Sequence, residues 1–387
     1  MNKTDLATLH PRFLTPFRWD IFWKKQRVMI DQNGLASTVP SMGFHLAVYL
    51  FNQIAWAIDG ILPSKIPTPQ TDQSLFIAGH QRSGTTFLHR LMAGNDWAHS
   101  LDLHEMLFPA SSFQHCLHAF SQLDQATGNH ILTRFNALQD RLLGHLDNIH
   151  RVRFNEPEED EFVMWSQYAS DICINDSPTL IDIGPKGMPK EFEFWTPEEQ
   201  FSALMWYRAC IQKKLQRQRG TGIYVGKNPR FSRVLPHLNT VFPDSKIIVL
   251  IRNPLEAIPS RMSLMLALWG SRKPKVERLS PAHVQWILQH SIGTYLKNEE
   301  GIKHIPEHRR ITVGYNDLKT NTRKTLHNIV EHLDLPELSP SVESRVSELE
   351  HQPYRSKHHY DLSEYGLTAD DIEGPLASVF RRYQHLF

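Results

Sequence analysis

The chain has 387 residues, with 42 basic and 41 acidic side chains and a formal net charge of +1. This balance indicates no bulk attraction to nucleic acid or to an anionic membrane, so any anion site has to be local. Hydrophobic residues make up 41% of the chain, which is enough for a substantial core. The length fits one large α/β domain with helical insertions, or two smaller domains.

The cysteines are three in number and far apart, so they predict neither a zinc site nor a disulfide framework. A reduced, cytoplasmic setting is therefore expected. Residues 1–19 lack the apolar run of a signal peptide. The most apolar stretch, Met42–Leu62, contains Asn52 and Asp59, which the interior of a membrane would resist. It predicts a buried or interfacial amphipathic helix rather than a spanning one.

The first predicted elements are helices, which end in a Pro-rich connector at Pro63–Pro69. Ser74–Ala78 follows as a buried strand and runs directly into the turn Gly79–Gly84. Apolar residues in Thr85–Ala93 then have helical spacing. These three segments predict a strand–loop–helix unit.

Residues 109–219 read as a long helical region. Within it, Glu158–Tyr168 follows Pro157 and begins with acidic residues, as the first turn of a helix prefers. Thr196–Arg217 begins with a Thr N-cap followed by Pro and ends in a basic run. Both segments are therefore expected to be helices.

Strand patterns return later in the chain, at Ile223–Val225, Lys246–Ile251 and Arg310–Val313. The middle one is a continuous β-branched run, typical of a parallel sheet that is covered on both faces. Helical patterns are expected at Phe231–Val241, Leu255–Leu268, Pro281–Lys303 and Thr322–Leu333. Strands that alternate with helices predict an α/β fold with a central parallel sheet and helices on both faces. We expect a helical N-terminal extension (1–70) and a main domain (71–387), which includes a helical insert (109–219) and an irregular tail with a last helix (340–387).

The loop Gly79–Thr86 has the spacing of a Walker A motif, but Thr85 stands where the lysine should be. A loop that opens a helix offers backbone N–H groups and the positive end of the helix dipole to an anion. The loop therefore predicts a phosphate site, with a turn that merely caps the helix as the alternative. The missing lysine argues against a kinase or NTPase. The lack of a convincing Mg²⁺-binding carboxylate further along the chain is a second argument against them.

A second anion site is indicated by Arg252-Asn253-Pro254, which follows the strand Lys246–Ile251 at once. Arg252 should therefore lie at the carboxyl end of a sheet strand, where α/β folds bind ligands. Ser260 is eight residues further on. An arginine with a hydroxyl group suits a terminal phosphate monoester.

Together these motifs resemble those of the sulfotransferase family that uses 3′-phosphoadenosine 5′-phosphosulfate (PAPS), in its bacterial-type branch. The resemblance covers about residues 74–387 and implies a P-loop-NTPase-like sulfotransferase fold. Its segments, in the family's order, are Gly79–Leu88, Val225–Pro229, Arg252–Pro254 with Ser260, Tyr315–Lys319 and the softer tail match at Tyr360–Thr368.

The resemblance implies a role for each matching residue. The loop would hold the 5′-phosphosulfate, Arg252 and Ser260 the 3′-phosphate, and Tyr315 would lie near the adenosine. Lys227 and Arg82 would stabilise the charge on the transferring group. The implied donor-binding residues are Gln81, Arg82, Ser83, Gly84, Thr85, Thr86, Arg252, Ser260 and Tyr315. The reaction would release 3′,5′-ADP and would require no metal.

The catalytic base is where the sequence departs from the family's animal branch. That branch has a histidine close to the position of Asn228, where this chain has Pro229 and Arg230. The bacterial branch uses a glutamate after the first helix, which implies Glu105 as the base, with His104 as its rival.

The acceptor is expected to be a hydroxyl of a small molecule, a lipid-like alcohol or a glycan. The sulfuryl group would reach this hydroxyl by in-line displacement. Nucleic acid is not expected as a partner. Contact with a membrane surface is left open but is not indicated. The alternatives are a P-loop kinase of small molecules and a nucleotide-binding protein without transfer activity. Two alternatives are open for the tail residues Arg355, Lys357, His358 and His359. They could close over the 3′-phosphate, but exposure on the surface is the expected arrangement.

Overall fold

A computed structural model describes the protein over residues 17–62, 71, 73–144, 147, 151–175, 177–184, 190–270, 275–351 and 361–387. The chain divides into two compact units. The sheet unit consists of Thr71–Ser100, Ile181–Lys186 and Thr221–Phe387. The helical unit consists of Met1–Gln70, Leu101–Leu180 and Gly187–Gly220.

The sheet unit is built on five parallel strands in the order β2-β3-β1-β4-β5. They are β1 (Leu75–Gly79), β2 (Ala98–His99), β3 (Ile223–Lys227), β4 (Lys246–Ile251) and β5 (Arg310–Gly314). The predicted parallel α/β sheet is confirmed. The two-residue strand β2 was not expected, because two residues are too few to form a pattern. Strand β3 is longer than predicted, since its ladder with β1 continues as far as Lys227.

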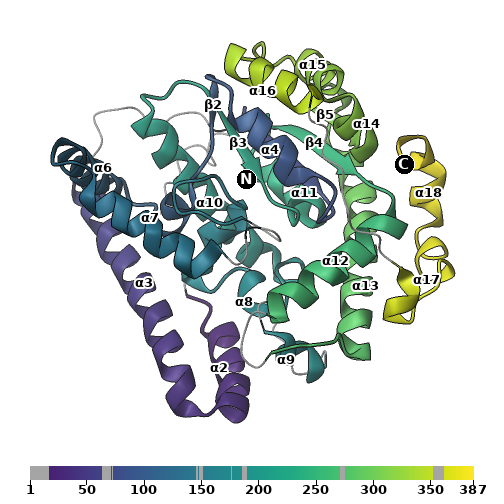
Figure 1. Cartoon of the computed structure of the whole chain (residues 1–387), viewed down its shortest axis with the longest axis horizontal. Helices are drawn as coiled ribbons and strands as arrows, with labels where there is room; N and C mark the ends of the chain where they lie inside the picture. Colours follow the sequence, from purple (N-terminus) through teal and green to yellow (C-terminus); the bar gives the residue numbers. More distant parts are fainter. Residues whose placement is uncertain are drawn as a thin grey trace. The chain divides into compact units, whose positions relative to one another are not determined.

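Nine helices of the described sheet unit surround these strands (Figure 1). They are α4 (Thr85–Ala93), α11 (Phe231–Val241), α12 (Pro254–Gly270), α13 (Pro281–Gly301), α14 (Tyr315–Thr320), α15 (Thr322–His332), α16 (Pro340–His351), α17 (Asp370–Glu373) and α18 (Ala377–Tyr383). The predicted helices are confirmed to within a few residues at each end. The prediction of an irregular tail is wrong for residues 340–351. They form α16, whose residues Val342 and Val346 are buried in the core. Residues 352–360, which include Arg355, Lys357, His358 and His359, lie outside the described residues.

Alternate side chains of the strands enter two different cores. Leu75 and Ile77 face a cluster that α4, α15 and α16 complete. Phe76 points to the other face, where its ring centroid lies 5.3 Å from that of Phe231 and 4.9 Å from that of Phe242. The period of two thus lets apolar residues cover both faces, as a doubly wound sheet requires.

The helical unit contains the longest helix of the described chain, α3 (Leu35–Ile61), which forms a hairpin with α2 (Trp19–Asn33) (Figure 1). The others are α5 (Leu103–Leu107), α6 (Ser111–Ala126), α7 (His130–Leu143), α8 (Ile172–Asn175) and α10 (Pro197–Arg217); α9 (Pro178–Asp182) lies where the chain passes between the units. As predicted, Thr196 caps α10, and its side chain and that of Glu199 form a reciprocal capping box. None of the described helices combines the length and the apolar character needed to cross a membrane.

The predicted helix at Glu158–Tyr168 is instead a 3-10 helix, Asp160–Gln167. The indole N–H of Trp206 donates to the carbonyl oxygen of Val163 over 3.1 Å. In an α-helix that carbonyl would accept from the fourth residue along the chain. This tertiary contact joins the 3-10 helix to α10, and local sequence could not reveal it.

Candidate functional site

Four strands of the sheet unit deliver the predicted anion-binding residues to one edge of the sheet. Because β1, β3, β4 and β5 are parallel, their carboxyl ends lie on the same side. In the ladders Gly79 pairs with Leu250, Ile77 with Lys227, and Ile251 with Gly314. The loop after β1, the end of β3 and the residues after β4 and β5 therefore meet at the edge where α/β folds bind their ligands.

The loop after β1 begins with a residue that has to be glycine. Gly79 has a φ of +142°, and a Cβ there would lie 2.6 Å from the carbonyl oxygen of Leu250. Its N–H donates to the Oγ of Ser232 over 2.8 Å. The start of the loop therefore lies so close to the backbone of the neighbouring strand β4 that no side chain fits at this position.

The loop ends at the start of α4, where the helix has no side-chain cap. Gly84 is the N-cap residue and has a left-handed φ of 86°. As a glycine, it offers no side chain that could bond to the first N–H groups of α4. These donors and the positive end of the helix dipole are the elements of an anion site. Of the side chains that would assist them, those of Ser83 and Thr85 are buried, and those of Gln81 and Thr86 are half-buried.

Arg82 joins the loop to the residues that follow β4. Its Nε donates to the Oγ of Ser260 over 3.1 Å. In turn, the Nη1 of Arg252 donates to the carbonyl oxygen of Arg82 over 2.9 Å. Arg82 has a left-handed φ of 68°, which is uncommon for a residue with a side chain. The structure therefore brings Arg82, Arg252 and Ser260 into one hydrogen-bonded group.

Tyr315 lies against the same group. The guanidinium carbon of Arg252 is 4.5 Å from the centroid of the Tyr315 ring, a distance at which cation–π attraction operates. A Cβ on Gly84 would lie 3.0 Å from the Tyr315 ring. Arg252 also pairs with Glu256 over 3.0 Å. Tyr315, Gly84 and Arg252 are thus packed together at the carboxyl ends of β1, β4 and β5.

Lys227 is the last residue of β3 and is fully buried at 0% exposure. The backbone N–H of its neighbour Asn228 donates to the carbonyl oxygen of Ile77 over 3.3 Å. This bond continues the ladder one residue beyond the strand, so the Lys227 position is fixed beside β1.

Glu105, in contrast, belongs to the helical unit, where it is engaged in ion pairs. Lys214 Nζ lies 2.6 Å from its Oε2, and Arg217 Nη2 lies 2.7 Å from its Oε1. Its Oε2 also accepts from the N–H of Asp102 over 3.0 Å. Burial raises the pKa of a carboxyl, but the two cations outweigh burial and lower the pKa of Glu105 to about 2. The rival base, His104, has its Nδ1 2.8 Å from the carbonyl oxygen of Phe154.

The sulfotransferase family's sequence profile matches residues 74–340. The chain belongs to this family. The match begins at the strand that precedes the loop Gly79–Thr86 and includes Lys227, Arg252, Ser260 and Tyr315.

Among named sulfotransferases, the chain is similar to the omega-hydroxy-beta-dihydromenaquinone-9 sulfotransferases Stf3 of Mycobacterium bovis and of Mycobacterium tuberculosis. Each is 27% identical over 274 residues, which are 68% of this chain and 63% of the relative. The aligned part is thus less than two thirds of each relative's length.

Solved sulfotransferase structures share the fold. The structure of STF9 from Mycobacterium avium has a TM-score of 0.67 and 18% identity, over 97% of this chain and 88% of that one. STF1 from Mycobacterium tuberculosis H37Rv has a TM-score of 0.66 and 17% identity, over 97% and 96% of the two chains. Together with the parallel sheet, these similarities establish the P-loop-like sulfotransferase fold.

Two residues that sequence reasoning did not select support the loop Gly79–Thr86. The rings of His80 and Tyr295 stack with their centroids 4.9 Å apart and their planes at 16°. The Tyr295 hydroxyl donates to the carbonyl oxygen of Arg252 over 2.9 Å. Burial, and then the charge of Arg261, hold the pKa of His80 well below its usual value, so its ring is neutral. Only the position of His80 within the loop could have drawn attention to it.

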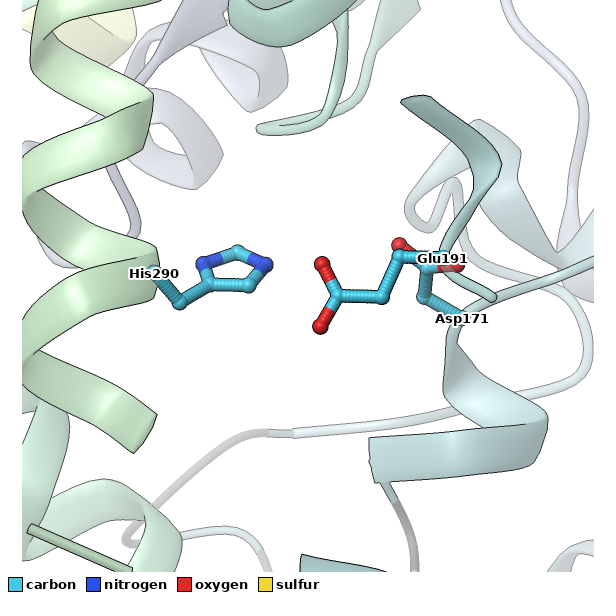
Figure 2. A group of neighbouring side chains, drawn as sticks. All are labelled: Asp171, Glu191 and His290. Carbon is cyan, nitrogen blue, oxygen red and sulfur yellow. The ribbon is translucent and has the colours of Figure 1, made fainter. Parts of the chain in front are cut away.

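A pair of buried acids in the helical unit was also overlooked. Carboxylate oxygens of Asp171 and Glu191 lie within 4.8 Å of each other (Figure 2). An Oδ1 of Asp171 accepts from the backbone N–H of Phe192 over 3.1 Å. His290, also labelled in Figure 2, belongs to α13 of the sheet unit, where the Nη1 of Arg261 donates to its Nδ1 over 2.8 Å. No motif joins Asp171 and Glu191, since they are 20 residues apart in sequence.

Proposed function

We propose that this protein transfers a sulfuryl group from PAPS to the hydroxyl group of a lipid-like alcohol. The observation that carries the proposal is the hydrogen-bonded group of Arg82, Ser260 and Arg252. It joins two anion-binding elements, the uncapped N-terminus of α4 and the carboxyl end of β4. A donor with a phosphate at the 3′ position and a phosphosulfate at the 5′ position needs two such elements in one sheet.

The residues present fit this donor. The first N–H groups of α4 would bind the 5′-phosphosulfate, assisted by the hydroxyls of Thr85 and Thr86. Arg252 and Ser260 would bind the 3′-phosphate. Since the Oγ of Ser260 accepts from Arg82, its own O–H remains available to donate to a phosphate oxygen. The Tyr315 ring, which already lies against Arg252, would contact the adenosine.

The chemical step forms a bond between the acceptor oxygen and sulfur and breaks the bond between sulfur and the leaving phosphate oxygen, which departs in 3′,5′-ADP. The role of this protein is to position the groups and to stabilise negative charge. Lys227 and Arg82 are the cations proposed for the sulfuryl oxygens and the leaving phosphate. The acceptor's proton passes to a base.

For the base we propose Glu105, on the family resemblance. Its pairing with Lys214 and Arg217 sets a condition, because a carboxylate with a pKa near 2 is a weak base. These two contacts would have to loosen when the acceptor binds. A purely structural role, in which Glu105 holds α5 to α10, is the alternative that the same contacts favour.

The lipid-like acceptor is proposed on two grounds. The Stf3 relatives are named for a menaquinone derivative, which is a lipid. The helical unit, in which the acceptor site is proposed, buries large apolar side chains such as Trp206, Tyr207 and Phe192.

The decisive experiment is an incubation of the purified protein with sulfur-labelled PAPS and a panel of alcohols that includes polyprenyl and long-chain alcohols, sugars and phenols. Label should pass to a long-chain alcohol without added metal. A parallel incubation with labelled ATP and Mg²⁺ tests the kinase alternative. Phosphate transfer, or tight binding of 3′,5′-ADP with no transfer to any alcohol, would replace the proposal by one of its two alternatives.

A further inference from the structure

The exposed face of α3 carries no charged side chain over the whole length of the helix. The residues along the middle of this face recur every three or four positions from Ala36 to Ile61, as on one side of an α-helix. Ile54 and Ile61 are 63% and 77% exposed, and Phe44, at the edge of the face, is 60% exposed. The only polar residues among the exposed positions of α3 are Ser37 and Ser41. The central positions are Ala36, Pro40, Gly43, Ala47, Leu50, Ile54, Ile58 and Ile61.

An ordinary surface helix turns charged residues outward and apolar ones inward, whereas α3 has apolar residues on both sides. Its buried residues are Thr38, Val48, Asn52, Ala55 and Trp56, so the inward side carries polar as well as apolar side chains. Asn52 is buried and donates to the carbonyl oxygen of Leu107 over 2.8 Å. Asp59 accepts from Ser111 and Ser112 over 2.7 and 2.8 Å and pairs with Lys213. Thus the polar groups of α3 fix it to the helical unit and leave its apolar face outward.

Neighbouring helices of the same unit also carry exposed apolar side chains. On α6 and α7, the exposed large apolar residues are Phe120, Leu123, Ile131, Leu132, Phe135 and Leu138. On α2, the stacked rings of Trp19 and Trp23 are 48% and 46% exposed. We call the exposed residues of α3, α6 and α7 the apolar surface. Soluble proteins seldom leave so many large apolar side chains together in water.

Basic groups are in excess on α6 and α7, where the exposed ionic residues are Arg134, Arg141 and Asp140, and Asp140 lies 3.0 Å from Arg153. This excess does not extend to α2, where the exposed ionic residues are Asp20, Arg27 and Asp31. Apolar side chains flanked by basic groups, with tryptophans at one end, are typical of helices that lie in the headgroup region of a bilayer.

We propose that the apolar surface docks on a lipid bilayer that contains anionic lipids, with α3 lying in the membrane interface. The helix is too polar on its inner side to span the membrane, in line with the result for the described helices. Docking would give the protein access to an acceptor that resides in the bilayer. This last point rests on the proposed function, whereas docking itself does not require any transfer.

The test is sedimentation of the full chain with vesicles of phosphatidylcholine mixed with phosphatidylglycerol, in the absence of PAPS. We expect the parent protein to bind. The double variant Leu50→Glu/Ile54→Glu should bind about tenfold more weakly or worse, because each carboxylate would have to leave water. The matched control is Asn328→Glu/Ser344→Glu, which adds the same charge at exposed positions of the sheet unit and should bind like the parent.

The variants alter exposed residues, so their thermal midpoints should stay close to that of the parent. A second double variant, Leu50→Ala/Ile54→Ala, leaves the net charge unchanged and should bind the vesicles with intermediate strength. Failure of the parent to bind vesicles, or equal binding by Leu50→Glu/Ile54→Glu, would overturn the proposal. A parent dimer that the glutamates dissociate, without vesicle binding, would identify a second copy as the occupant. Binding of 3′,5′-ADP measured without vesicles reports on the proposed function separately.

Discussion

Arg82 and Ser260 share a hydrogen bond of 3.1 Å, although they are 178 residues apart and belong to the two different phosphate-binding motifs. The same guanidinium is proposed to assist the 5′-phosphosulfate, and the same hydroxyl is proposed to bind the 3′-phosphate. Binding at one position should therefore affect the other. Arg252 strengthens the connection, because it donates to the carbonyl oxygen of Arg82.

The first prediction is that Arg82 and Ser260 act as a coupled pair in nucleotide binding. Ser260→Ala should weaken 3′,5′-ADP binding about tenfold, since a hydrogen bond to a charged group contributes about 1.5–3 kcal/mol. In the double variant Arg82→Gln/Ser260→Ala the two losses should not add, with a coupling energy above about 0.5 kcal/mol. Calorimetry of the parent, both single variants and the double variant measures this coupling. Strictly additive losses would contradict it.

The second prediction concerns the 3′-phosphate. The parent should bind 3′,5′-ADP more tightly than 5′-AMP, and Arg252→Ala should bring the two affinities close together, with a loss of about ten- to a hundredfold for 3′,5′-ADP. Arg252→Lys keeps the charge but not the planar fork and should fall in between. Equal affinities of the parent for the two nucleotides would rule out a 3′-phosphate site.

The third prediction concerns the backbone of the loop. Gly79→Ala should destabilise the fold by about 2–4 kcal/mol, because the new Cβ would meet the Leu250 carbonyl oxygen at 2.6 Å and because L-residues disfavour a φ of +142°. The control is Gly43→Ala on α3, where nothing lies within 4 Å; it should be neutral or stabilise by about 0.5–1 kcal/mol. Chemical denaturation compares them, and equal stabilities of the two variants would refute the close approach.

The fourth prediction follows from the ion pairs of Glu105. Its pKa of about 2 lies below the ordinary value of 4.5, so the folded state holds fewer protons than the unfolded state. The resulting stability, on the order of 3 kcal/mol, is present above about pH 4.5 and is lost as the pH falls towards 2. Glu105→Gln should therefore be much less stable than the parent at pH 7, and the difference should narrow below pH 4.5.

The same variant separates the two roles of Glu105. If the role of Glu105 is structural, Glu105→Gln should lose much of its thermal stability. At a temperature where the variant is folded, its turnover should then be near that of the parent. A base predicts a fall in kcat of about 10²–10⁴ with unchanged 3′,5′-ADP affinity. The ion pairs with Lys214 and Arg217 lead us to expect a stability loss in either case.

Much of the fold could be predicted from the sequence, because the sheet is made of strands with strong local patterns. Lys246–Ile251 is a β-branched run, and its limits were predicted correctly. The loop Gly79–Thr86 was predictable for a similar reason, since its glycines adopt backbone conformations that few other residues adopt. Motifs that are local in the chain are thus visible without a structure.

Features that depend on distant contacts could not be predicted. The stacking of His80 on Tyr295 joins residues 215 positions apart, and neither has a neighbouring pattern that points to the other. The pairing of Glu105 with Lys214 and Arg217 is likewise a tertiary contact. For this reason its resemblance to a catalytic glutamate carried no information about its pKa. The individual roles of the site residues remain predictions.

The division of the chain into units has a consequence for how such proteins diversify. Every residue proposed to bind the donor lies in the sheet unit, whereas Glu105 and the apolar surface lie in the helical unit. On the proposed assignment, mutations in the helical unit would alter which alcohol is accepted, or which membrane is approached, while donor recognition stays intact. An engineer who seeks a new acceptor would then randomise the helical unit alone and keep the proposed donor site unchanged.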